Sequence, residues 1–139
     1  MSRLCPILDS SLSTLLTDLS DRGLLETTIV VCVGEMGGSP KLSGKPGLLG
    51  RNHYPRCFSG VIAGGGFKGG NVVGVTNEDG GQIVERPIHP WDLWASVYTK
   101  MGIDYTKRIP TPSGCGQAFI SPLATGKVPG TGGLLTEIM

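Results

Sequence analysis

The chain has 139 residues, a length that fits one domain and is sufficient for a hydrophobic core. Its hydrophobic content of 39% and charged content of 17% are typical of a globular protein and exclude an intrinsically disordered chain. Because the formal net charge is +1 and no apolar segment approaches ~18 residues, the sequence predicts neither nucleic-acid binding nor a membrane span.

Helical periodicity begins near the amino end. Between Leu8 and Leu19, leucines recur three or four residues apart and form the apolar stripe of a helix that packs on one side. Arg22 followed by Gly23 is typical of the last turn and the end of such a helix. We therefore predict a helix over residues 9–22.

An apolar, β-branched run, Thr27–Val33, follows this helix. The run is short and does not alternate with polar residues, which is typical of a strand covered on both faces. It therefore predicts the central strand of a parallel sheet, where ligands bind beyond the carboxyl ends of the strands. A second apolar run, Phe58–Ala63, predicts another strand.

Glycine-rich loops separate these strands from the next elements. The chain holds 23 glycines, more than double the usual share of about 7%. Gly64–Gly69 fits the G-x-G-x-x-G pattern of a dinucleotide-binding turn, but that site needs a helix directly after the glycines. Because residues 71–76 are predicted as a strand, we interpret the stretch as a turn between strands and keep the dinucleotide site as the lesser alternative.

A hairpin and a second helix are predicted further along. The hairpin between Val72 and Glu85 turns around Asp79-Gly80, a pair that tolerates positive φ. Pro90 suits the first position of a helix, and Gly102 is typical of its end.

Glu35 and His53 are the residues whose positions suggest a site. Glu35 directly follows the predicted central strand, and His53 precedes the next one. A carboxylate oxygen and an imidazole nitrogen suit zinc or a similar divalent ion, although a metal site needs three or four ligands. From the pattern alone, the alternatives are a solvated carboxylate that caps a turn and a histidine hydrogen-bonded within a loop.

Several short motifs occur in a specific order along the chain. They are Arg22-Gly23-Leu24-Leu25, Gly34-Glu35, Gly50-Arg51 with His53, Ala63 to Gly66, Lys68-Gly69-Gly70, Arg86-Pro87, Asp92-Leu93 and Gly102-Ile103-Asp104. This ordered set resembles the sulfatase-like bacterial family of unknown function within the alkaline phosphatase superfamily.

The resemblance implies a partial α/β fold: an alkaline-phosphatase-like layered sandwich with a mostly parallel sheet, two main helices and long Gly-rich loops. Residues 1–139 are then a single fragment, the carboxyl-terminal part of a sulfatase-like domain, with a loop-rich tail over residues 106–139. The missing amino-terminal half would carry the nucleophile, so no catalytic residue is assigned in this chain. Family members are often exported, which implies a periplasmic or exported protein if a leader lies upstream.

The implied function is metal-dependent hydrolysis of phosphate or sulfate esters, with a small-molecule or polymeric anionic ester as substrate. Glu35 and His53 would bind the divalent metal, which the resemblance leaves open as zinc, calcium or magnesium. Arg51 and Asn52 would bind the substrate. This chain alone would be inactive.

Two departures from the family pattern keep other functions open. Gly38 stands where the family has arginine, and Asn52 stands where it has an acidic residue. Both changes favour the alternative of a non-catalytic binding or scaffolding protein that retains the fold. A third possibility, an independently folding glycine-rich module, would require two helices to cover both faces of the Thr27–Val33 strand.

Overall fold

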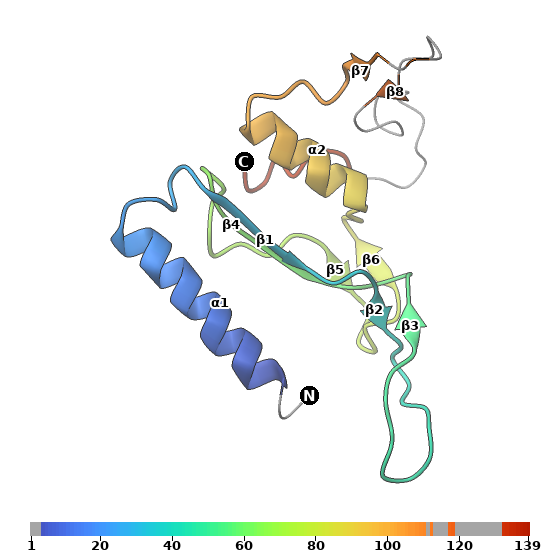
Figure 1. Cartoon of the computed structure of the whole chain (residues 1–139). Coiled ribbons are helices and arrows are strands. Elements are labelled where there is room, and N and C mark those ends of the chain that lie inside the picture. The colour runs from blue at the N-terminus through green and yellow to red at the C-terminus, as the bar shows by residue number, and fades with distance from the viewer. Residues whose placement is uncertain (1–3, 111, 113–116, 119–131) are drawn as a thin grey trace.

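The computed structural model describes residues 4–110, 112, 117–118 and 132–139. Over these residues the chain forms two helices and four short strand pairs (Figure 1). The helices are α1 (Leu4–Asp21) and α2 (Pro90–Lys100). The strands are β1 (Ile29–Val33), β2 (Gly37–Gly38), β3 (His53–Tyr54), β4 (Gly60–Gly64), β5 (Val75–Thr76), β6 (Ile83–Glu85), β7 (Arg108–Ile109) and β8 (Gln117–Ala118).

The mostly parallel sheet, and with it the layered sandwich, is a wrong prediction. All four strand pairs of the described residues are antiparallel: β1–β4, β2–β3, β5–β6 and β7–β8. β1 leads into β2 and β3 leads into β4, so the chain doubles back as one bent hairpin. A parallel pair needs a crossover connection, usually a helix, and residues 34–59 form none. β1 therefore meets β4 in the opposite direction.

The two predicted helices are confirmed, although α1 extends further toward the amino end than its predicted start. α2 begins at Pro90, whose fixed φ suits the first helical position. The Asp92 carboxylate accepts a hydrogen bond from the His89 N–H at 2.9 Å and so satisfies a donor at the helix start. Gly102, with φ of 72°, follows the helix end.

The turn after β4 needs glycine. Gly64, Gly65 and Gly66 have φ values of 73°, 55° and 79°, in the left-handed region. A Cβ on Gly64 would lie 2.2 Å from the carbonyl oxygen of Thr28. The turn leads toward β5 and no helix begins at these glycines, so the interpretation as a turn between strands is confirmed. The dinucleotide alternative fails because it requires that helix.

The hydrophobic core lies on one side of the β1–β4 hairpin. Its buried members are Phe67, Val97, Leu135 and Ile138. Ile29 and Val31, alternate residues of β1 that share one face of the strand, pack against it. Figure 1 shows α2 on this side of the hairpin and α1 on the other.

A buried serine joins α2 to the last residues of the chain. Ser96 is 0% exposed, and its hydroxyl donates to the Asp92 carbonyl oxygen at 2.7 Å. The same oxygen accepts the Leu135 N–H at 2.8 Å. Ser96 therefore connects residues 39 positions apart in the sequence.

An ion pair holds the same segment from outside the core. The Arg86 guanidinium binds the Glu137 carboxylate through Nε and Nη2 and also donates to the Leu134 carbonyl oxygen at 2.7 Å. The hydrogen bonds from Arg86 lower the pKa of Glu137 to about 2. Of the predicted loop-rich tail, residues 111, 113–116 and 119–131 lie outside the described residues, while 132–139 pack against α2.

The side of the hairpin that faces α1 is much less buried. No residue of α1 is buried, and Leu4, Leu8 and Leu15 are 72%, 55% and 46% exposed. Val61 of β4 lies on this side, because it is adjacent to the core-facing Ile62, and it is 51% exposed. Among the described residues, no helix is both long enough and apolar enough to cross a membrane.

Candidate functional site

The segments after β1 and before β4 meet in the short β2–β3 ribbon. Gly37 faces Tyr54 and Gly38 faces His53 in this pair. A Cβ on Gly37 would lie 2.0 Å from the carbonyl oxygen of Cys57, so this close approach requires glycine. The ribbon places the predicted site residues at one end of the β1–β4 hairpin.

Glu35 lies in the bend before β2, and His53 is the first residue of β3. Both side chains are exposed, and neither makes a hydrogen bond or ion pair with another described residue. Glu35 precedes Gly37, which faces Tyr54, whereas His53 faces Gly38 three residues beyond Glu35, so the two residues flank opposite ends of this short ribbon. The structure does not bring the two side chains into direct contact.

Glu35 and His53 do not by themselves form a complete set of metal ligands. Within the part of the chain that the structure describes, no group of three or more His, Cys, Asp or Glu side chains is arranged to hold a metal ion. Zinc is held by three or four protein ligands, and calcium and magnesium need more oxygen donors than one carboxylate provides. Glu35 and His53 therefore fit part of a site, and further donors would have to come from elsewhere.

Arg51 and Asn52, the predicted substrate-binding residues, hold the loop after β2. The Arg51 side chain crosses Gly38, where a Cβ would lie 3.1 Å from Arg51 Cδ. Its Nη1 donates to the carbonyl oxygens of Ser39 and Pro40, the second at 2.6 Å. The Asn52 N–H donates to Ser39 Oγ at 3.0 Å. Their contact with a substrate stays a prediction.

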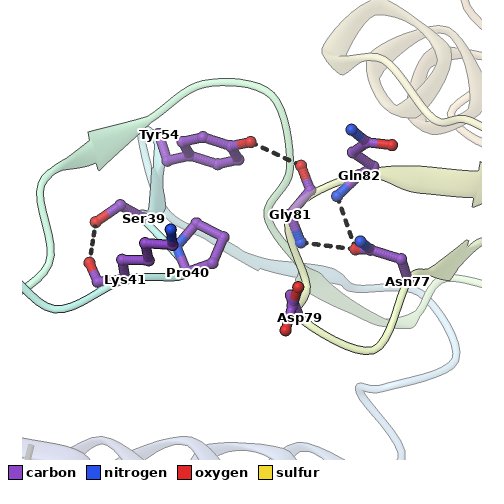
Figure 2. Close-up of a pocket in the computed structure, with 8 residues that line it drawn as sticks. All are labelled: Ser39, Pro40, Lys41, Tyr54, Asn77, Asp79, Gly81 and Gln82. Atoms are coloured by element: carbon purple, nitrogen blue, oxygen red, sulfur yellow. Dashed lines mark hydrogen bonds between the residues drawn. The ribbon is translucent and has the colours of Figure 1, made fainter.

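A hollow of about 390 Å³ lies next to the ribbon, between it and the β5–β6 turn (Figure 2). We call it the Tyr54 hollow. Its lining residues are Ser39, Pro40, Lys41, Tyr54, Asn77, Asp79, Gly81 and Gln82. The Tyr54 hydroxyl donates to the Gly81 carbonyl oxygen at 2.8 Å and so connects the two walls.

The residue pattern does not predict this hollow. Asp79-Gly80 correctly predicts the turn between β5 and β6, but Tyr54 and Gly81 are 27 positions apart and nothing in their types links them. One signal exists: consecutive strand residues face opposite sides, so Tyr54 must face away from the surface that His53 faces. This alternation predicts that Tyr54 faces a different surface from His53, but it does not predict that the β5–β6 turn lies opposite Tyr54.

Comparison with known proteins gives a family match and no close relative. No curated protein and no solved structure is significantly similar to this chain. A family model described as "Protein of unknown function (DUF1501)" matches residues 1–119. The expected membership of a sulfatase-like family in the alkaline phosphatase superfamily is therefore wrong, because the matched family is described only as having unknown function and nothing shows a sulfatase or alkaline phosphatase family. The chain belongs to the DUF1501 family.

Proposed function

We propose that this chain is the carboxyl-terminal part of a metal-dependent hydrolase of phosphate or sulfate esters, and that it is inactive alone. The observation that carries the proposal is that Glu35 and His53 lie on the two segments that pair as the β2–β3 ribbon, where His53 faces Gly38, three residues after Glu35. Both side chains are exposed, and neither side chain has a hydrogen-bond partner among the described residues. A free carboxylate and a free imidazole are the donors that zinc-type sites use.

The remaining ligands and the nucleophile would come from polypeptide that completes the domain. The poorly covered α1 side of the hairpin supports this requirement, because Leu4 and Leu8 of α1 are 72% and 55% exposed and Val61 of β4 is 51% exposed. Soluble proteins rarely expose contiguous apolar patches larger than a few hundred Å² unless another surface covers them.

Arg51 is suited to the substrate anion in this arrangement. Nη1 holds the Ser39–Pro40 loop, whereas Nε and Nη2 make no hydrogen bond with any described residue. These two donors are oriented by the fixed Nη1 and can bind two oxygens of a phosphate or sulfate group. A divalent cation, when bound, would activate the nucleophile and offset negative charge on the ester oxygens.

A second candidate function is a non-catalytic binding or scaffolding role. It is favoured by the lack of a third metal donor beside Glu35 and His53 within the described residues. The two functions differ in one measurable property, because only the hydrolase turns over an ester.

The test is metal analysis of the full-length protein, meaning this chain together with the polypeptide that completes the domain, beside its variants Glu35→Ala and His53→Ala. We expect the wild type to retain a divalent metal and to hydrolyse members of a panel of phosphate and sulfate esters, with metal and activity largely lost in both variants. Glu26→Ala removes an exposed carboxylate distant from the ribbon in sequence and serves as the matched control. Unchanged metal content in both site variants would remove the site assignment. Retained metal without turnover of any ester would favour the non-catalytic role.

A further inference from the structure

The Tyr54 hollow carries two opposite charges that do not neutralise each other. Lys41 comes from the loop after β2, and Asp79 comes from the turn between β5 and β6 (Figure 2). Both side chains are exposed, and neither forms an ion pair or hydrogen bond with a described residue through its charged group. One wall of the hollow is therefore cationic and the other is anionic.

Hydrogen bonds fix the anionic wall. Asn77 Oδ1 accepts the N–H groups of Gly81 and Gln82, each at 2.9 Å, and the Gly80 N–H donates to the Asn77 carbonyl oxygen at 2.9 Å. The Tyr54 hydroxyl then connects this turn to β3. Asp79 is thus carried on a turn that is ordered without any ligand.

The cationic wall is fixed in a similar way. The Ser39 hydroxyl donates to the Lys41 carbonyl oxygen at 2.8 Å, and Arg51 holds the carbonyl oxygens of Ser39 and Pro40. Because both walls are held by hydrogen bonds between side chains and the backbone, a ligand that bridges Lys41 and Asp79 would not have to order either wall.

The surface between the two charges is apolar. It is formed by the ring of Tyr54, whose hydroxyl is already used, and by the ring of Pro40. A short hydrocarbon chain can lie on these rings and remove apolar surface from water. The hollow therefore presents a cation, an apolar surface and an anion in one open site.

We propose that the Tyr54 hollow binds a small zwitterion. The carboxylate of the ligand pairs with Lys41, its ammonium group pairs with Asp79, and the methylene chain between them lies on Tyr54 and Pro40. Exposed ion pairs contribute little individually, so the affinity is in the millimolar range and falls with added salt. The hollow lies apart from the proposed metal ligand His53, because His53 and Tyr54 face opposite sides of β3. The two sites share Arg51, which holds the Ser39–Pro40 loop through Nη1.

The experiment uses the full chain labelled with ¹⁵N and a series of ω-amino acids from glycine to 6-aminohexanoate. We expect saturable amide shifts at Gly81, Gln82 and Tyr54 for one favoured chain length, because hydrogen bonds hold the loop that carries Lys41 and the turn that carries Asp79. Hexanoate and hexylamine, which carry one charge each, should bind at least about fivefold more weakly. Lys41→Met and Asp79→Asn should each weaken binding by a similar factor.

Matched controls separate the charge pair from general surface effects. Lys45→Met and Glu78→Gln remove exposed charges that lie near the hollow in sequence but do not line it, and both should bind as the wild type does. The proposal is overturned if hexylamine or hexanoate binds as tightly as the best ω-amino acid, if Lys41→Met and Asp79→Asn bind normally, or if no member of the series gives saturable shifts.

Discussion

The two helices flank the same hairpin, but only one of them is part of a closed core. α1 and α2 carry apolar stripes of similar strength. Yet α2 contains buried residues, including Ser96 and Val97, whereas α1 contains none. The difference therefore does not arise from helix amphipathicity. It arises because residues 132–139 return to pack against α2, and no described segment covers α1 in the same way.

The strongest test of this comparison removes a core side chain that residues 132–139 place against α2. Leu135 is 3% exposed and packs in the core with Phe67, Val97 and Ile138. We expect Leu135→Ala to lower the free energy of unfolding by about 2–5 kcal/mol, because a buried leucine is replaced by a cavity. Urea unfolding followed by circular dichroism measures the change. A loss below about 0.5 kcal/mol, typical of surface sites, would mean that the tail does not complete the core.

The hydrogen bond from the Leu135 N–H to the Ser96 hydroxyl, within the same core, gives the next largest effect. Ser96→Ala removes the acceptor of the Leu135 N–H in a site that is 0% exposed. Leaving a buried donor without its partner costs about 1–3 kcal/mol, measured by the same unfolding experiment. Hydrogen exchange at the Leu135 amide should also become faster. Ser20→Ala, at an exposed serine of α1, is the matched control and should leave stability nearly unchanged; equal losses in both variants would contradict the comparison.

The unequal packing of the two sides could be predicted only in part from the sequence. The leucine stripe of α1, Pro90 at the start of α2 and Asp79-Gly80 in the β5–β6 turn act over a few residues, and the corresponding elements are found. The Thr27–Val33 run shows that a strand is apolar on both faces but does not show the direction of its neighbour. That direction depends on whether residues 34–59 cross over or double back, which is a long-range property.

The candidate site shows the same division between local and long-range information. Glu35 and His53 can be selected from their types and their positions beside predicted strands. Their surroundings cannot, because Arg51 holds the loop through main-chain carbonyls and Tyr54 reaches a carbonyl 27 positions away. Any residue type supplies a carbonyl oxygen, so such contacts leave no signal in the residue pattern.

Acid pH should weaken the attachment of residues 132–139 to the α2 side of the hairpin, because it protonates Glu137. Its pKa is about 2 in the folded chain against 4.5 for the ordinary group, because Arg86 donates hydrogen bonds to the carboxylate. The stabilisation is therefore complete above pH 4.5 and is lost as the pH falls toward 2. We expect the thermal midpoints of wild type and Glu137→Gln to differ at neutral pH and to converge over this range.

Added salt and a control carboxylate, Glu78, provide checks on that prediction. Glu137 is accessible to solvent, so the difference should be modest and should shrink with added salt. Glu78→Gln, which removes a carboxylate without a described partner, should show no comparable dependence on pH. A difference for Glu137→Gln that stays constant down to pH 2 would exclude the ion pair as its cause.

The smallest effects are expected on α1, where they are the most informative. Leu8 and Leu15 are 55% and 46% exposed, so alanine at either position should change the free energy of unfolding by less than about 0.5 kcal/mol. Leu15→Glu should likewise leave stability nearly unchanged but reduce the binding of a hydrophobic dye, because it places a charge in the bare apolar stripe. If Leu8→Ala instead cost as much as Leu135→Ala, α1 would be packed as well as α2. The hairpin would then have no bare side, and the requirement for additional polypeptide in the proposed hydrolase would lose its structural support.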